Sequence, residues 1–167
     1  DGSAVTAKDY VFALLLESSP EMMGVDHYSA TGYTFLDGWE AYNNGETKQL
    51  KGVRLVDDLT FSVTVAAEEL PFHYDLAYAA VTPRPLAVIA PGCDIADGEE
   101  GASVSGDFST DVLLTTINDP DTGYRYHPQV TCGAYSLESY DAASRQGTVV
   151  ANEHLRCSLR LWRTRLP

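Results

Sequence analysis

Hydrophobic and polar residues recur with two different periods along this chain, and together they predict helices interspersed with β-hairpins. The apolar run Tyr10–Leu16 is typical of a well-buried helix, and Thr6 with Asp9 gives an imperfect capping box at its start. Because proline cannot continue the helical hydrogen-bond ladder, Pro20 is expected to stop this helix. Residues 24–33 are then expected to form a loop.

Further helices are predicted where apolar residues recur at helical spacing. They cover Phe35–Tyr42, Pro71–Val81 and Phe108–Ile117, with a short apolar piece at Leu86–Ala90. The stretch Pro91–Gly106 is acidic and rich in glycine, so we expect a surface excursion there.

Strict alternation predicts two hairpins. Apolar residues alternate with polar ones through Val53–Val65, around a two-residue turn at Asp57-Asp58. A second pair of strands is expected at Gly133–Tyr140 and Gly147–Val150. Since helices and hairpins follow one another without a strict βαβ order, the fold class is expected to be α+β, with helices packed on short mixed or antiparallel hairpins.

The strongly acidic composition argues against two classes of partner. The 167 residues carry a formal charge of −13, whereas nucleic acids and anionic membranes attract clustered Lys and Arg, so neither partner is expected. The longest apolar run, Val11–Leu16, is far too short to span a bilayer. Four of the eleven bases lie in residues 156–167. This basic tail is of uncertain origin, either a docking strand or an artefact of read-through.

No catalytic, cofactor or metal motif stands out. The histidines are scattered, and neither a zinc spacing, a GxSxG elbow nor a glycine-rich phosphate loop is present. The segment Asp119–Gly123 resembles the start of a calcium loop, but its glycine is at position five and position twelve is Val130. An ordinary Asp-Pro turn is the expected structure. Cys132 could in principle be a nucleophile paired with His127, but nothing in the sequence shows a base aimed at the thiol.

Two pairs of residues are candidates for other roles. Tyr28 and Tyr33 lie in the loop after the first helix, where they could contact a ligand or simply pack. Cys93 and Cys132 could form a disulfide if the protein works outside the cytoplasm, or they could be two buried thiols. Such a disulfide would close a loop of about forty residues. By reducing the entropy of the unfolded chain, it would raise the free energy of unfolding by roughly 4 kcal/mol.

Five segments, taken in order, resemble one family. They are residues 1–12 (DGSAVTAKDYVF), 51–65 (KGVRLVDDLTFSVTV), 70–74 (LPFHY), 82–85 (TPRP) and 131–137 (TCGAYSL). Their order and spacing are similar to those of the solute-binding proteins of oligopeptide and dipeptide ABC importers, extracellular solute-binding family 5. The resemblance runs to about residue 152, after which the chain departs from the family's Asn-Pro-x-Tyr-Trp segment.

The resemblance implies a periplasmic-binding-protein type II-like architecture. Residues 1–130 would be the small α+β subdomain of the first lobe, and residues 131–155 would supply strands of the neighbouring lobe. Gly133 is expected to allow close passage of the chain as it enters that lobe. Because members of the family are much longer, the chain is expected to be a fragment.

The implied function is capture of a peptide or similar small solute outside the cytoplasm, in the periplasm or as a cell-surface lipoprotein, and delivery to ABC permease subunits. Membrane contact would come only through an N-terminal anchor that the fragment lacks. No enzyme activity and no cofactor are expected. Two alternatives stay open: an extracytoplasmic hydrolase domain with paired carboxylates, and a protein-interaction module that uses the loop around Tyr28 and Tyr33.

Overall fold

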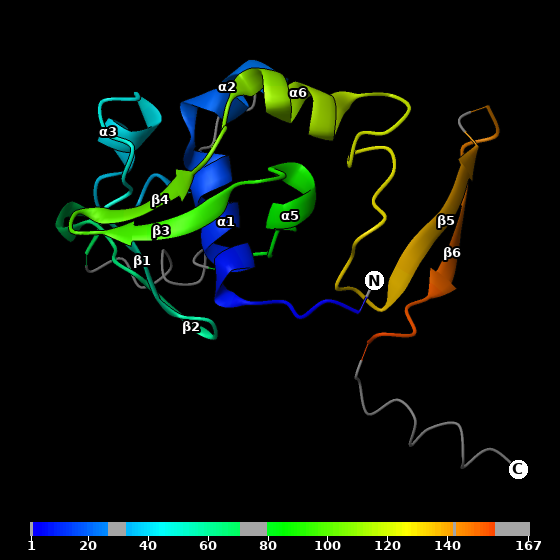
Figure 1. Ribbon diagram of the computed structural model, residues 1–167, viewed down its shortest axis with the longest axis horizontal. Coiled ribbons are helices and arrows are strands. Elements are labelled where there is room, and N and C mark those ends of the chain that lie inside the picture. The colour runs from blue at the N-terminus through cyan, green and yellow to red at the C-terminus, as the bar shows by residue number, and fades with distance from the viewer. Residues whose placement is uncertain (1, 27–32, 71–79, 142, 156–167) are drawn as a thin grey trace, which may run out of the picture.

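The computed structural model describes residues 2–26, 33–70, 80–141 and 143–155, and it has the α+β character that the sequence predicts (Figure 1). The helices are α1 (Ala7–Ser18), α2 (Pro20–Asp26), α3 (Trp39–Asn43), α5 (Leu86–Ile89) and α6 (Thr110–Asn118), with a 3-10 turn, η2, at Ala67–Glu69. The strands are β1 (Val53–Asp57), β2 (Thr60–Val63), β3 (Asp94–Gly98), β4 (Gly101–Ser105), β5 (Tyr135–Asp141) and β6 (Gln146–Ala151). In the described part of the chain they pair as three antiparallel two-stranded sheets. The predicted helix Pro71–Val81 and the basic tail lie wholly or mostly outside the described residues.

Helix α1 is the centre of the body (Figure 1). Its six consecutive residues Val11–Leu16 are all buried, with exposed fractions of 2% or less. A helix that is apolar on every side must be covered on every side, and the two N-terminal hairpins and the other helices surround α1. Burying each large apolar side chain stabilises the folded state by roughly 1.5–3 kcal/mol relative to leaving it in water.

The start of α1 confirms the predicted capping box. The Asp9 carboxylate accepts the backbone N–H of Thr6 at 2.9 Å, and the Thr6 hydroxyl donates to the same oxygen at 3.3 Å. The Asp9 backbone N–H donates to the Thr6 carbonyl at 3.1 Å. An aspartate therefore fills the place that glutamate or glutamine usually takes.

A second helix, α2, begins at Pro20 and was not predicted, and it covers the first three residues of the loop expected at 24–33. Pro20 is the first residue of the new helix, a position at which its missing N–H costs nothing. The Ser19 hydroxyl donates to the Leu16 carbonyl at 2.9 Å and accepts the Met22 N–H at 3.2 Å. One serine thus ends α1 and caps α2.

Helix α3 is shorter than the predicted Phe35–Tyr42. Gly38 has a φ of 77°, a left-handed conformation that only glycine adopts easily, and it separates the helix from the residues before it. Leu36 instead forms a β-bridge with Val65. Tyr42 is buried, and its hydroxyl donates to the Leu15 carbonyl at 3.4 Å.

Strands β1 and β2 form the hairpin that alternation predicts, but the turn is one residue later. Asp57 pairs with Thr60, and the Asp57 carboxylate accepts the N–H of Leu59 at 2.8 Å, so the turn residues are Asp58 and Leu59. The Asp58 carbonyl accepts the N–H of Ala7 at 2.8 Å. The hairpin turn is therefore bonded directly to the first residue of α1.

The surface excursion predicted for Pro91–Gly106 is wrong, because this stretch contains the hairpin β3–β4. Ile95 pairs with Val104, and Ile95 is buried against the core. The many acids and glycines hid the alternation, since only these two residues and Ala102 supply an apolar face. Leu50 bridges Ala102 of β4, with its N–H donating to the Ala102 carbonyl at 2.9 Å.

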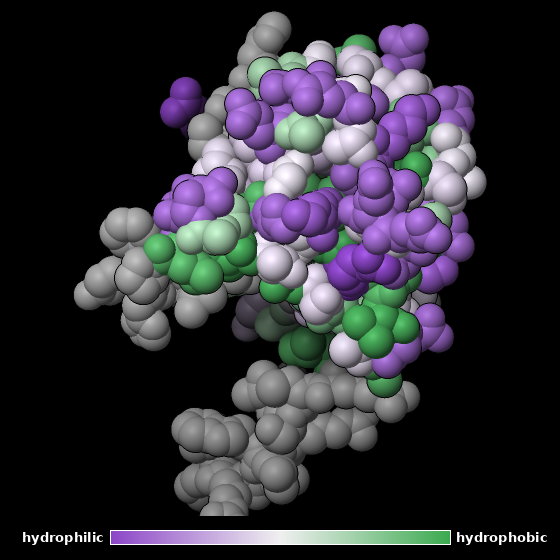
Figure 2. Space-filling view, turned by 90° about the vertical axis from the view of Figure 1, so that its left-hand side faces the viewer, coloured by the Kyte–Doolittle hydropathy of each residue, from purple (hydrophilic) through white to green (hydrophobic). Residues whose placement is uncertain are grey.

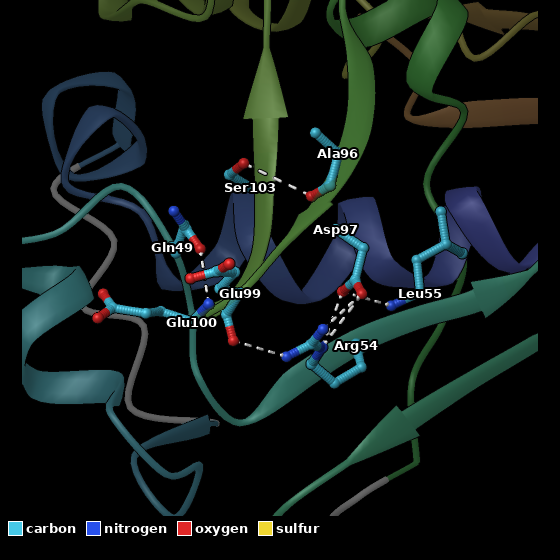
Figure 3. Close-up of polar contacts among 8 residues, drawn as sticks. All are labelled: Gln49, Arg54, Leu55, Ala96, Asp97, Glu99, Glu100 and Ser103. Carbon is cyan, nitrogen blue, oxygen red and sulfur yellow. Dashed lines mark hydrogen bonds and ion pairs between the residues drawn. The ribbon is translucent and has the colours of Figure 1, made fainter.

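Arg54 and Asp97 join the first two hairpins (Figure 3). The Arg54 guanidinium donates to the Asp97 carboxylate through Nε and Nη2, at 3.0 and 2.8 Å, and to the Glu99 carbonyl at 3.1 Å. The same carboxylate accepts the backbone N–H of Leu55 at 3.2 Å. One carboxylate on β3 therefore serves both the side chain and the backbone of β1.

Helices α2 and α6 lie side by side over one end of α1 (Figure 1). The Asn118 amide donates to the Val25 carbonyl at 2.9 Å, and the Thr116 hydroxyl donates to the Ile89 carbonyl of α5 at 2.7 Å. The predictions of helix at Phe108–Ile117 and of a short apolar piece at Leu86–Ala90 are both confirmed, with α6 beginning two residues later than expected.

The third hairpin, β5–β6, confirms the last strand prediction and stands apart from the body (Figure 1). No described helix or strand packs extensively against it. Every described residue of β6 is exposed, and the large apolar side chains of the hairpin are open to solvent, with Tyr135 64% and Val149 57% exposed. On the body, hydrophilic side chains dominate the face at the opposite end of the molecule (Figure 2). None of the described helices has the length and apolar character needed to cross a bilayer.

The Arg54–Asp97 contact gives the first prediction. Arg54→Ala should lower the free energy of unfolding by about 0.5–1 kcal/mol, the upper range for a partly exposed ion pair with two-point geometry. Asp97→Ala should lower the free energy of unfolding by more, about 1–2 kcal/mol, because it also removes the acceptor of the Leu55 N–H. Urea unfolding followed by circular dichroism measures both.

Glu99→Ala is the matched control, since Arg54 uses only the backbone carbonyl of Glu99. It should change stability by less than about 0.5 kcal/mol. Equal losses for Asp97→Ala and Glu99→Ala would contradict a specific bond and would indicate only a general charge effect.

Candidate functional site

An open hollow of about 1010 Å³ lies where the helical body meets the base of the β5–β6 hairpin. Segments that are far apart in sequence line it: residues 2–5, 82–85 with 87–88, 130–133 with Tyr124, and 152–155, together with Asp9. At one wall, Gly2 lies so close to the His154 ring that an added Cβ would be 3.3 Å from it. The hollow is the candidate site because it is the concave surface that these separate segments build together.

The body side of the hollow is organised by Asp9. Its carboxylate accepts the Leu86 N–H at 3.4 Å in addition to that of Thr6, and its carbonyl accepts the Arg84 N–H at 3.1 Å. The Arg84 guanidinium donates through Nη2 to Glu17 of α1 at 2.9 Å. Asp9 and Arg84 thus use their charges to hold residues 82–86 against α1, which gives them a structural role.

The hairpin side is organised by Asn152. Its amide nitrogen donates to the Gly133 carbonyl at 2.9 Å and to the Thr131 carbonyl at 3.3 Å, and its backbone N–H donates to Ala134 at 2.9 Å. Its side-chain oxygen accepts the His154 N–H at 3.0 Å. Asn152 therefore clasps the two chain segments that enter and leave the hairpin.

Tyr124 ties the incoming segment to the body. Its hydroxyl donates to the Val130 carbonyl at 2.7 Å. Burial raises the pKa of Tyr124, while the nearby Arg84 charge acts in the opposite direction. A phenol kept protonated in this way is a stable donor across the physiological range.

Gly133 lines the hollow, and a Cβ added there would meet no described atom closer than the Tyr135 carbonyl at 3.8 Å. The close passage expected there is toward a neighbouring lobe, so it stays a prediction. Within the body, glycine is needed where the backbone packs tightly: an added Cβ at Gly52 would lie 2.8 Å from the Asp37 backbone, and one at Gly101 would lie closer still to the Leu50 carbonyl.

The two candidate tyrosines have different outcomes. Tyr28 lies outside the described residues. Tyr33 is 8% exposed and packs edge-to-face on Phe35 with ring centroids 6.3 Å apart. Its ring is part of the hydrophobic core, and contact with a ligand stays a prediction.

The two candidate cysteines are both free thiols in the structure. Cys93 is half-buried and packs against the core, and burial raises its pKa, with the charge of Asp107 adding to the effect. Cys132 is exposed at the rim of the hollow. The predicted disulfide is thus not formed in the structure, and the pairing stays a prediction.

His127 and the Asp119–Gly123 segment, the other candidates from the sequence, both make local hydrogen bonds within one turn. His127 lies with Nε2 3.1 Å from the Pro120 carbonyl, inside its own turn. The Asp119 carboxylate accepts the backbone N–H groups of Asp121 and Thr122 at 2.8 and 2.9 Å, which is the Asp-Pro turn expected from the sequence. The described residues contain no cluster of three or more His, Cys, Asp or Glu that could hold a metal ion.

Comparison with protein-family models, with curated proteins and with solved structures finds no match to this chain.

Asn152 is the residue of this site that the sequence did not single out. The available signal was an asparagine at the end of a predicted strand. The carbonyls to which its side-chain amide donates, those of Thr131 and Gly133, can be identified only in the folded structure. We expect Asn152→Ala to leave the unfolding midpoint of the body nearly unchanged. It should accelerate amide hydrogen exchange throughout β5 and β6 by about tenfold, since each lost hydrogen bond is worth about 1 kcal/mol.

Glu153→Ala is the control for the clasp, because no described hydrogen bond of the site uses the Glu153 side chain. Hydrogen exchange should be unchanged in this variant. If Asn152→Ala left β5 and β6 exchange unaltered, Asn152 would not be what holds the hairpin base.

Thiol labelling tests the two cysteines. In a Cys157→Ser background at mildly alkaline pH, iodoacetamide should alkylate exposed Cys132 several-fold faster than Cys93, whose thiolate is disfavoured by burial. Peptide mapping of the alkylated sites gives the two rates. If protein purified without reductant labels at neither site even in denaturant, the disulfide is formed.

Proposed function

We propose that this chain is part of an extracytoplasmic solute-binding protein that captures peptides, or a similar small solute, for an ABC importer. The proposal rests on the family resemblance of its five segments. In this proposal the α+β body is the small subdomain of the first lobe of a periplasmic-binding-protein type II-like fold, and β5–β6 belongs to the neighbouring lobe.

The observation that carries the proposal is that four of the five resembling segments contact one another or line one hollow, the fifth, 70–74, lying mostly outside the described residues. Residues 1–12 contact 51–65 through the Ala7–Asp58 hydrogen bond and through Tyr10, which stacks on Phe61 with centroids 5.6 Å apart. They contact 82–85 through Asp9 and Arg84. With 131–133 they line one hollow. Segments that share a signature only by chance have no reason to converge in this way.

The exposed hairpin supports the same proposal. Strands β5 and β6 place Tyr135, Leu137, Tyr140, Val149 and Val150 in solvent. Exposed apolar side chains gathered on one element are typical of a surface that another part of a protein covers. A second lobe packed on β5–β6 would bury them and would close the hollow at its base.

The four described carboxylates whose pKa is shifted do not fit the general acid of a hydrolase. A glycosidase-type general acid needs a raised pKa. Hydrogen bonds instead lower the pKa of Asp57, Asp94, Asp119 and Asp141, through the Leu59 N–H, the Lys8 ammonium, the Asp121 N–H and the Ser144 hydroxyl as the first donor to each. These groups are held as carboxylates that order turns and strands.

Calorimetric titration with a mixture of short peptides tests the proposal. A transporter-type cleft surrounds its ligand between two lobes, so the full gene product should bind a subset of peptides with micromolar or better affinity. The 167-residue chain alone offers one wall and should bind none of them in that range. Micromolar peptide binding by the chain alone, or peptide binding by neither protein, would contradict the proposal.

A further inference from the structure

We infer that Cys132 forms a disulfide with Cys157, which ties the start of the basic tail to the rim of the hollow. This goes beyond the proposed function and does not depend on it, since the bond lies within the chain. It follows from where the described residues place the Cys132 thiol and the segment 152–155. Cys157 lies outside the described residues, and its position in the sequence limits how far it can be from Leu155.

The Cys132 thiol is open to the hollow. The residue is exposed, and it lines the hollow next to Thr131 and Gly133. The Asn152 side-chain amide donates to the carbonyls of both of these neighbours, at 3.3 and 2.9 Å. An exposed thiol on a backbone held from both sides can react with a second thiol without any opening of the core.

Asn152 also holds the chain that leaves the hairpin close to Cys132. Its backbone N–H donates to the Ala134 carbonyl at 2.9 Å. Its carbonyl accepts the Leu155 N–H at 3.2 Å, and its side-chain oxygen accepts the His154 N–H at 3.0 Å. These bonds turn the chain back after the strand, so that Leu155 lines the same hollow as Cys132.

Cys157 is only two residues beyond Leu155. Since consecutive Cα atoms are about 3.8 Å apart, the Cys157 Cα lies within about 7.6 Å of the Leu155 Cα. A disulfide needs its two Cα atoms about 4.4–6.8 Å apart. A two-residue connection from one wall of the hollow therefore keeps the Cys157 thiol within reach of Cys132 at a high effective concentration.

Cys93 is the poorer partner for Cys132. It packs against the core and is not among the residues that line the hollow. A Cβ added at Gly106 would lie 3.1 Å from the Cys93 Sγ, so this sulfur lies against the chain that leaves β4. Burial and the Asp107 charge raise the pKa of Cys93, which disfavours its reactive thiolate. Pairing with Cys132 would require the Cys93 side chain to leave its packed position.

A small disulfide such as oxidised glutathione supplies the oxidising equivalent. The Cys132 thiolate attacks one sulfur of this oxidant, which forms a mixed disulfide and releases one small thiolate. The Cys157 thiolate then attacks the Cys132 sulfur, forms the bond within the chain and releases the second small thiolate. The protein loses two electrons and two thiol protons, and the oxidant is reduced to two thiols.

The bond closes a loop from Cys132 to Cys157 that contains both strands of the β5–β6 hairpin. It adds a covalent link to the hydrogen bonds of Asn152 at the base of the hairpin. It also fixes the beginning of the tail, residues 156–167, beside the hollow. Reduction releases that attachment, so the two cysteines form a redox-sensitive tether.

Peptide mapping of the 167-residue chain tests the pairing. The protein is equilibrated with mixtures of oxidised and reduced glutathione at neutral pH, quenched with acid, alkylated with N-ethylmaleimide and digested with trypsin without reduction. We expect a linked pair of peptides that carry Cys132 and Cys157, with Cys93 alkylated. Cys93→Ser is the matched control and should form the same link at the same glutathione ratio. Cys157→Ser should leave Cys132 alkylated at every ratio.

Asn152→Ala tests the geometric basis of the link. Loss of its side-chain hydrogen bonds should raise the ratio of oxidised to reduced glutathione needed for half formation by about tenfold, since each bond is worth about a factor of ten or less. Glu153→Ala should leave this ratio unchanged. Equal ratios for Asn152→Ala and the wild type would overturn the inference that Asn152 brings the two thiols together.

Three results of the mapping would overturn the pairing itself. These are a link between Cys93 and Cys132 in the wild-type chain, alkylated Cys132 and Cys157 at every glutathione ratio, and mixed disulfides with glutathione in place of a link. An equal yield of the Cys132–Cys157 link in native buffer and in urea would show that the fold does not direct it, and would also contradict the inference. Since none of these measurements involves a peptide ligand, their failure leaves the proposed function to its own test.

Discussion

The burial of α1 is the constraint on which the rest of the body depends. A helix with six consecutive buried residues cannot lie on a surface, so it needs neighbours on every side. Hairpins β1–β2 and β3–β4 and helices α2, α3 and α5 all contact it. Both ends of the helix are bonded to neighbouring elements. The Asp58 carbonyl accepts the N–H of Ala7 at its start, and the Ser19 hydroxyl bonds the end of α1 and the start of α2.

The body and the β5–β6 hairpin differ in how far their side chains and backbone groups are paired with other parts of the described chain. In the body, charged residues such as Arg54, Asp97 and Asp9 serve neighbouring strands and loops. In the β5–β6 hairpin, apolar side chains and both strand edges face solvent. The hollow lies between the two parts, and Asn152 joins the two chain segments at the base of the hairpin. This contrast is what a unit completed by another surface should show, and it supports the proposed second lobe.

The sequence predicted those elements whose stability comes from local patterns. The capping box at Thr6, the continuous apolar run of α1 and the alternation of β1–β2 and β5–β6 are each visible within about fifteen residues. The first helix does end before Pro20 as predicted, but the start of α2 at Pro20 was missed, because a proline that stops one helix also suits the first position of another.

Features that depend on tertiary contacts could not be predicted. The β3–β4 hairpin has a sparse apolar face, so its pairing is supported by Leu50 and Arg54 from elsewhere in the chain. At the candidate site, the acceptors of Asn152 lie about twenty residues away in sequence. The tight backbone packing at Gly52 and Gly101 was not predicted, because a glycine's neighbours are known only once the chain has folded.

The central claim is that β5–β6 is a surface completed by a further lobe of the same protein. Amide exchange of the dilute 167-residue chain, compared with that of the full gene product, measures this directly. We expect the β5 and β6 amides to be at least about a hundredfold better protected in the full product, because a covering lobe must open before they exchange. Equal exchange in the two proteins, with the body amides protected in both, would mean that nothing covers the hairpin and would contradict the account.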